Sequence, residues 1–204
     1  MGRTLTCAFM QWSPGLGDNT FMGWLTVGVY LLATIASVAA LRAMGADALS
    51  RRERLFWAIS AAVMLFLAVN KQLDLQSLVT MIGRCHAQLA GWYNDRRAVQ
   101  KLFILGVAAG GVLLLGVLAL MLRGILDRVW AALLGLGFVC VFVVIRAASF
   151  HHVDLLISGT ALGVRINWLL ELPGPLLVTL VALRRRQTVL TGRSLLATNQ
   201  NPGS

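Results

Sequence analysis

Charged residues are scarce in this chain of 204 residues, of which 13% are Asp, Glu, Lys or Arg and 58% are hydrophobic. Soluble domains carry about a quarter of their residues as charged groups, so the composition indicates an integral membrane protein. Acidic residues are scarcest, with 8 against 18 basic ones. No nucleic-acid motif accompanies this excess. It therefore favours basic loops that anchor helices against anionic lipid, and we expect no nucleic-acid partner.

Cysteines are few, and the known catalytic signatures are missing. Cys7, Cys85 and Cys140 form no Cys-x-x-Cys pair and are odd in number, so we expect neither a disulfide framework nor a zinc site. The chain has no Gly-x-Ser-x-Gly, no His-Glu-x-x-His and no phosphate-binding loop, and we assign no metal site. Common catalytic mechanisms therefore find no support in the motifs.

Long apolar runs are abundant, and they predict how the chain crosses the membrane. A hydrocarbon core of about 30 Å requires about 20 apolar residues per helix. The runs predict an all-α polytopic helix bundle with five transmembrane helices over Phe21 to Leu41, Leu55 to about Leu75, Leu102 to Leu122, Val129 to about Phe150, and Ile166 to Leu183. Pro173 and Pro175 should kink or break the fifth helix near its start.

The polar stretch from Asn70 to Asp74 follows directly on the second apolar run. The purely apolar part of this span ends at Val69 and is too short alone, so the helix must continue through the polar residues. Apolar residues then recur with helical spacing, which predicts an amphipathic interfacial helix at about 74–93. The chain thus divides into an N-terminal extracytoplasmic segment over 1–20, a transmembrane bundle over 21–186 and a flexible cytoplasmic tail over 187–204.

The distribution of Lys and Arg predicts the orientation of the bundle. With five alternating spans, ten basic residues fall on one side, mostly in short connections, and eight on the other. The positive-inside rule then places the N-terminus outside and the C-terminus in the cytoplasm. The outer side also gathers the unusual polar residues, which are Asn70, Lys71, Asp74, Arg84, Arg96, Arg97, Arg146, His151, His152, Asp154, Arg165, Asn167 and Glu171.

The charges of this convergent set of polar residues allow two interpretations. Internal salt bridges would join Lys71 or Arg146 to one of the carboxylates of Asp74, Asp154 and Glu171. Because cations outnumber carboxylates, the leading hypothesis is a binding or accessory membrane protein that accepts an anionic lipid headgroup or a similar ligand. The carboxylates would then orient the cations that bind the charge, which are Lys71, Arg84, Arg96, Arg97, Arg146 and Arg165.

Two other classes of function stay open. In a lipid-acting hydrolase or transferase, His151 or His152 would be the general base and Asp154 would orient it. In a homo-oligomer or a structural subunit of a larger membrane complex, Gly106 and Gly110 of the third span would allow close packing against a partner. No cofactor is favoured, since no spacing supports a haem held by His86 and one of the two adjacent histidines.

Three segments carry a resemblance to other sequences. They are NKQLDLQ at 70–76, GRCHAQLAGWYNDRR at 83–97 and RAASFHH at 146–152. Together they resemble an uncharacterised family of small bacterial polytopic membrane proteins, over about the middle half of the chain. The resemblance implies a multi-pass protein of the bacterial inner (cytoplasmic) membrane and brings no activity with it.

Overall fold

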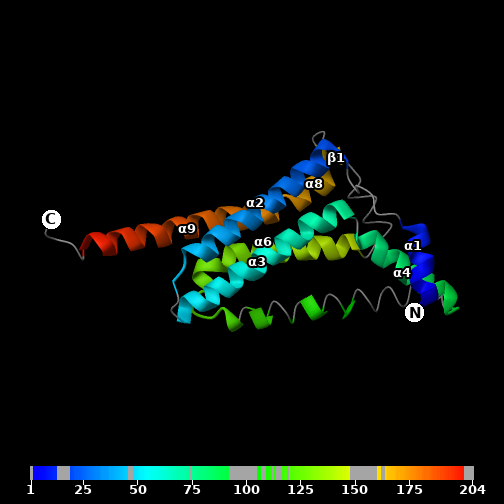
Figure 1. The fold of residues 1–204 in the computed structure, drawn as a ribbon, viewed down its shortest axis with the longest axis horizontal. Helices are drawn as coiled ribbons and strands as arrows, with labels where there is room; N and C mark the ends of the chain where they lie inside the picture. The colour runs from blue at the N-terminus through cyan, green and yellow to red at the C-terminus, as the bar shows by residue number, and fades with distance from the viewer. Residues whose placement is uncertain are drawn as a thin grey trace.

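The computed structural model describes residues 2–12, 19–45, 48–73, 75–91, 105–106, 109–111, 113, 116–118, 120–147, 160–161 and 164–199. This part of the chain is almost entirely helical (Figure 1). Its helices are α1 (Gly2–Gln11), α2 (Phe21–Ala43), α3 (Ala48–Leu73), α4 (Leu75–Leu89), α6 (Leu126–Ala147), α8 (Ile166–Glu171) and α9 (Pro173–Asn199). Directly before α8, β1 (Thr160–Ala161) and β2 (Val164–Arg165) form a short antiparallel pair.

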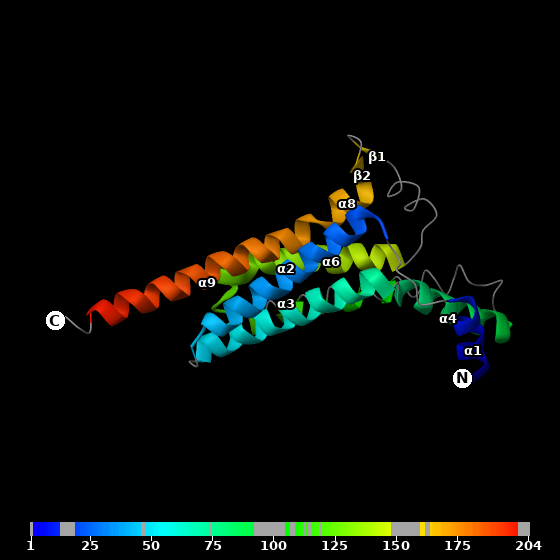
Figure 2. The same ribbon diagram turned by 45° about the horizontal axis from the view of Figure 1, so that its top comes forward.

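Four long helices, α2, α3, α6 and α9, form the bundle. α2 packs against both α3 and α9, and α6 packs against α9, so the four lie side by side in both views (Figures 1 and 2). The core between them is apolar, and its largest fully buried side chains include Trp57, Tyr30, Met64 and Ile125. Small residues of α2 such as Ala33 and Ala40 are also fully buried, which lets the neighbouring helices approach closely.

Three helices are long and apolar enough to cross a bilayer, at Phe21–Ala43, Arg51–Leu73 and Leu126–Val143. Large apolar side chains on their outer faces are exposed, among them Ile35, Phe66 and Leu134. Such faces are stable where hydrocarbon rather than water surrounds the helix. The predicted all-helical class is confirmed, and the three spans indicate a membrane protein.

The predicted count of five spans is wrong for the described residues, where three helices meet the requirement. The third predicted span, Leu102 to Leu122, is described only in part, at residues 105–106, 109–111, 113, 116–118 and 120–122. The fifth is divided, because α8 ends at Glu171 and α9 begins at Pro173 after a bend. From Pro173, only 11 residues precede Arg184, too few to cross the hydrocarbon core alone.

The break between α8 and α9 is where the two prolines predict it. Proline removes a backbone donor and clashes with the preceding turn, but it fits the first turn of a new helix. Pro173 and Pro175 accordingly lie in the first turn of α9. At its other end α9 continues to Asn199, so this helix occupies residues 187–199 of the segment expected as a flexible tail over 187–204. No proline interrupts residues 187–199, which include three Leu, one Gln and one Arg, all good helix formers.

The second predicted span continues through its polar residues. α3 includes Asn70, Lys71 and Gln72 and ends at Leu73, as the length requirement predicts. α4 follows at Leu75, within the segment from 74 to 93. The chain therefore passes from one helix to the next with a single residue between them.

α1 lies in the N-terminal segment, for which the sequence predicts no element. It packs against α4 at the end of the bundle away from the C-terminus (Figures 1 and 2). A disulfide joins Cys7 of α1 to Cys85 of α4, whose Cα atoms are 6.1 Å apart. The expectation of no disulfide is therefore wrong. The two cysteines are separated by 78 positions in the chain, so only the packing of the two helices brings them together.

α6 and α9 approach each other closely at two glycines. A Cβ atom added at Gly174 would meet the side chain of Val139 and would lie 2.8 Å from the carbonyl oxygen of Gly135. Real Cβ atoms essentially never come that close to other atoms. Glycine at position 174 therefore fixes the start of α9 against α6, directly after the bend that follows Glu171.

Candidate functional site

Two charged side chains from distant parts of the chain form a buried ion pair at the end of the bundle that carries α1 and α4. Lys71, in the last turn of α3, places Nζ 2.8 Å from Oε2 of Glu171, and their side chains are 7% and 4% exposed. Tyr30 of α2 donates its hydroxyl to the other carboxylate oxygen of Glu171 at 3.3 Å. One carboxylate thus links α2, α3 and α8.

This ion pair is one of the internal salt bridges that the sequence allows. A charge withdrawn from water is tolerated when it is paired and hydrogen-bonded, and Glu171 has both a cation and a hydroxyl donor. Lys71 and Glu171 neutralise each other. The pair itself therefore offers no net positive charge to an anion at this end of the bundle.

A buried amide lies next to this pair in the sequence. The side-chain oxygen and nitrogen of Gln72 are both buried, and neither has a hydrogen-bond partner among the described residues. Buried polar groups are normally hydrogen-bonded, because an unpaired one retains the full cost of leaving water. A polar group of a ligand at this place would be stabilised by the amide.

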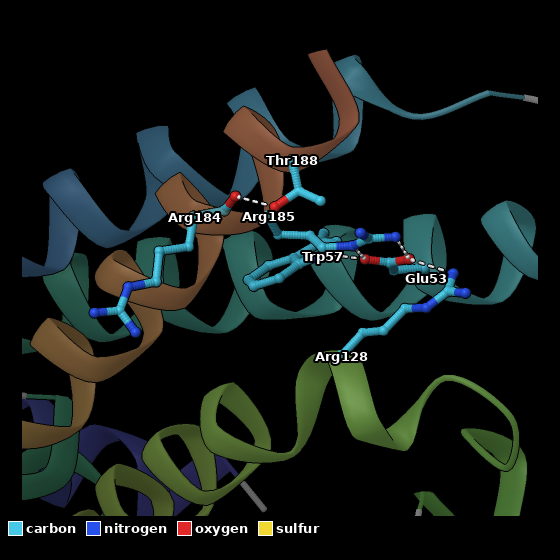
Figure 3. A network of polar contacts seen from close by, with 6 residues as sticks. All are labelled: Glu53, Trp57, Arg128, Arg184, Arg185 and Thr188. Carbon is cyan, nitrogen blue, oxygen red and sulfur yellow. Dashed lines mark hydrogen bonds and ion pairs between the residues drawn. The ribbon is translucent and has the colours of Figure 1, made fainter. Parts of the chain in front are cut away.

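A second buried carboxylate lies at the opposite end of the bundle (Figure 3). Glu53, near the start of α3, is 1% exposed. Arg185 of α9 donates Nε to Oε1 at 2.5 Å and Nη2 to Oε2 at 2.9 Å, which is the bidentate geometry that Arg forms with carboxylates. The Trp57 indole also donates to Oε1 at 3.5 Å, and Arg128 of α6 places Nη1 3.9 Å from Oε2. Glu53 thus links α3 to α6 and α9.

The charge of Arg185 is stabilised by this contact. The hydrogen bond to Glu53 raises the pKa of the Arg185 guanidinium above its ordinary value, and burial opposes the shift. Stabilisation from a raised pKa is fully present below the pKa of the unfolded state and is lost only as the pH rises through the folded value. Because both values for Arg185 are strongly basic, this side of the ion pair persists throughout the physiological range of pH.

The two ion-pair networks are separated by about the thickness of a membrane. Glu53 and Lys71 are 18 positions apart on α3, which at 1.5 Å per residue is about 27 Å. The hydrocarbon core of a bilayer is about 30 Å thick. Both networks therefore lie near the edges of the core, where charged groups cost less than at its centre.

The structure brings together only part of the predicted site. Lys71 and Glu171 meet, Asn70 is half-buried on the same helix, and Arg84 is exposed on α4. The backbones of Arg146, Arg165 and Asn167 belong to α6, β2 and α8, while their side chains lie outside the described part of the chain. The other predicted residues lie wholly outside it, and they are Asp74, Arg96, Arg97, His151, His152 and Asp154. The enzyme and haem hypotheses, which depend on the histidines, remain predictions.

Glu53, Tyr30 and Arg185 are among the residues of the buried networks that sequence reasoning missed. Glu53 stands in the run Arg-Arg-Glu-Arg, residues 51–54, and an acid among arginines at the start of a span is a signal for an ion pair. Tyr30 is a polar group in an otherwise apolar run, which is a weaker signal because tyrosine is common in membrane helices. Nothing local to Arg185 distinguishes it from Arg184 and Arg186. Only the rotation of α9 selects it, and Figure 3 shows Arg184 pointing away from Glu53.

Comparison of the chain with protein families, with curated proteins and with solved structures finds no match. Among the described residues, no group of three or more His, Cys, Asp or Glu side chains could hold a metal ion. The function must be inferred from the residues and contacts of this chain.

Proposed function

We propose that this protein is a membrane-bound binding or accessory protein that holds an anionic lipid headgroup, or a ligand of similar charge, where α3 ends and α8 begins. The observation that carries this proposal is the Lys71–Glu171 ion pair, beside which the Gln72 amide is buried without a partner among the described residues. The ion pair draws the end of α3 to α8, so that residues from distant parts of the chain border one place.

Two arginines supply the charge for an anion in this proposal. Arg146 is in the last turn of α6, and Arg165 is in β2, directly before α8. Both positions belong to the end of the bundle that holds Glu171, whose own charge is taken up by Lys71. Arg binds phosphate and carboxylate oxygens through two parallel hydrogen bonds. We assign charge binding to Arg146 and Arg165, and hydrogen bonding of the ligand to Gln72.

We also propose that this end of the bundle faces away from the cytoplasm. Disulfides persist in oxidising compartments such as the bacterial periplasm, and the disulfide between Cys7 and Cys85 is at this end. The opposite end carries Arg42, Arg123 and Arg184 to Arg186, as the positive-inside rule requires of a cytoplasmic face. A bacterial inner membrane provides both conditions, with a periplasm on one side and the cytoplasm on the other.

Native mass spectrometry of the purified full chain tests the binding. From nanodiscs with equal amounts of phosphatidylglycerol and phosphatidylcholine, the protein should retain the anionic lipid preferentially. The double variant Arg146→Gln/Arg165→Gln should retain phosphatidylglycerol at this site at least about tenfold less than the unchanged protein. Each hydrogen bond to a charged group contributes about 1.5–3 kcal/mol. Arg193→Gln, on the exposed part of α9, is the matched control and should behave as the unchanged protein does.

Equal retention of the two lipids by the unchanged protein would contradict the proposal. So would an equal loss in the double variant and in Arg193→Gln, since it would reflect net charge instead of a site. Turnover of a lipid substrate that stops in His152→Ala would favour the membrane-enzyme alternative.

A further inference from the structure

A groove of about 580 Å³ lies between α1 and α4, apart from the Lys71–Glu171 ion pair. Arg3 and Leu5 border it from α1, and Ile82, His86 and Leu89 border it from α4. The disulfide between Cys7 and Cys85 lies one helical turn along α1 from Arg3 and almost one turn along α4 from Ile82. This covalent link holds the two walls of the groove together.

Among the described residues that line it, the groove combines basic and apolar side chains and has no acidic one. The sequences of α1 and α4 contain no Asp or Glu, whereas Arg3 and His86 line the groove. Leu5 and Leu89 at the groove are 43% and 56% exposed, so apolar surface is present beside the cations. This pairing of chemistries matches a molecule with an anionic head and a hydrocarbon chain.

The outer surface of α1 near the groove has the character of a surface that contacts lipid. Phe9 and Met10 are 54% and 84% exposed, although they are large and apolar. Phe9 packs edge-on against Trp12 at a centroid distance of 6.0 Å, and such aromatic residues gather at the level of lipid headgroups. α4 begins beside the end of α3, where the span ends and headgroups begin, and α1 lies against α4 in both views (Figures 1 and 2).

We propose that the disulfide-linked groove between α1 and α4 binds an anionic phospholipid. The Arg3 guanidinium contacts the phosphate, His86 lies beside it, and the acyl chain runs over Leu5, Ile82 and Leu89. This inference goes beyond the function proposed above, because it adds a lipid site that shares no residue with Gln72, Arg146 or Arg165. The groove exists only while α1 remains attached to α4, so lipid binding here depends on the disulfide.

Photo-crosslinking of the full chain in nanodiscs tests this site separately from the first. The probe is phosphatidylglycerol with a diazirine in its acyl chain, and phosphatidylcholine with the same diazirine is the matched probe. Peptide mapping should find the phosphatidylglycerol adduct on residues 2–12 and 78–91 of the unchanged protein. Arg3→Gln should lower that adduct about tenfold, in line with the loss of one charged hydrogen bond, while Arg193→Gln should leave it unchanged.

A second variant tests the role of the disulfide. Cys7→Ser/Cys85→Ser should lose the adduct on both peptides, while a Cys140→Ser control should keep it. The proposal is overturned if both probes label α1 and α4 equally, if Arg3→Gln has no effect, or if the double cysteine variant keeps full labelling. Competition by glycerol 1-phosphate would also overturn it, because a soluble phosphate ester would then suffice without an acyl chain.

The outcome is distinct from that of the function proposed above. Loss of one bound phosphatidylglycerol in Arg146→Gln/Arg165→Gln, with unchanged labelling of α1 and α4, would support both sites. If α1 and α4 are labelled but Arg146→Gln/Arg165→Gln has no specific effect on lipid retention, the results would support the groove alone.

Discussion

At the scale of single residues, Lys71 and Glu171 stabilise the bundle only while both charges are present. Lys71→Met would leave the Glu171 carboxylate buried, at 4% side-chain exposure, with a hydrogen bond from the Tyr30 hydroxyl but without the ammonium group of Lys71. Removing one partner of a buried pair typically costs about 3–5 kcal/mol, whereas replacing both with apolar residues is often nearly neutral. We expect Lys71→Met to lower the free energy of unfolding by about 3 kcal/mol or more, and Lys71→Met/Glu171→Leu to lower it much less.

Unfolding in mixed micelles with increasing dodecyl sulfate measures both changes. The conservative variant Lys71→Arg keeps the charge and serves as the control. If the double variant were as unstable as Lys71→Met, the stabilisation would come from the shape of the side chains and not from the pairing of their charges.

The same residues show what a sequence can reveal about a site. Lys71 and Glu171 are recognisable because each is an ionisable residue in or beside an apolar run, where a partner is required. Which carboxylate pairs with Lys71 is not recognisable, since Asp74, Asp154 and Glu171 are all consistent with the same topology. The choice depends on the rotation of α3 and α8 about their axes, and rotation is set by packing over the whole bundle.

At the scale of elements, the contact between α6 and α9 depends on the absence of a side chain at Gly174. Gly174→Ala would place a Cβ atom 2.8 Å from a backbone carbonyl oxygen, and relief of such overpacking typically costs about 1–3 kcal/mol. Gly192→Ala, in the same helix but with open space around its Cβ position, should be neutral or stabilising by up to about 1 kcal/mol, because alanine is the better helix former. Thermal unfolding of the two variants in the same detergent compares them directly.

A reversed order of stability in that comparison would show that α6 and α9 do not pack through these glycines. Gly135→Ala provides a second test from the opposite side, since its Cβ atom would meet the carbonyl oxygen of Gly174 at 2.8 Å.

Elements were predictable from the sequence where one physical requirement dominates. Span length requires α3 to include Asn70 and Lys71, and proline chemistry requires the break before α9. α1 has no comparable signal, because its ten residues include only a short apolar stretch, and its position depends on a disulfide to a helix far along the chain. The continuation of α9 past Arg186 is missed because a polar sequence that contains good helix formers is compatible with either a helix or a flexible tail.

At the scale of the whole molecule, the disulfide and the distribution of arginine lead to the same orientation in the membrane. In a Cys140→Ser background, an impermeant maleimide should label Asn19→Cys in intact cells, since this exposed position precedes α2 at the end that carries the disulfide. Ser194→Cys, exposed near the end of α9, should be labelled only after the membrane is opened. Labelling of Ser194→Cys in intact cells would reverse the proposed orientation.

The two ion pairs have a further consequence for the order in which the helices can join. α3 carries an acid first and a base second, Glu53 and then Lys71, and the chain of α8 and α9 also carries an acid first and a base second, Glu171 and then Arg185. Because the two run antiparallel (Figure 2), each acid meets a base. A last helix inserted in the opposite direction would bring Glu53 to Glu171 and Lys71 to Arg185, and like charges at both membrane edges would repel it. The four charges therefore favour the antiparallel arrangement of α3 with α8 and α9 over the parallel one.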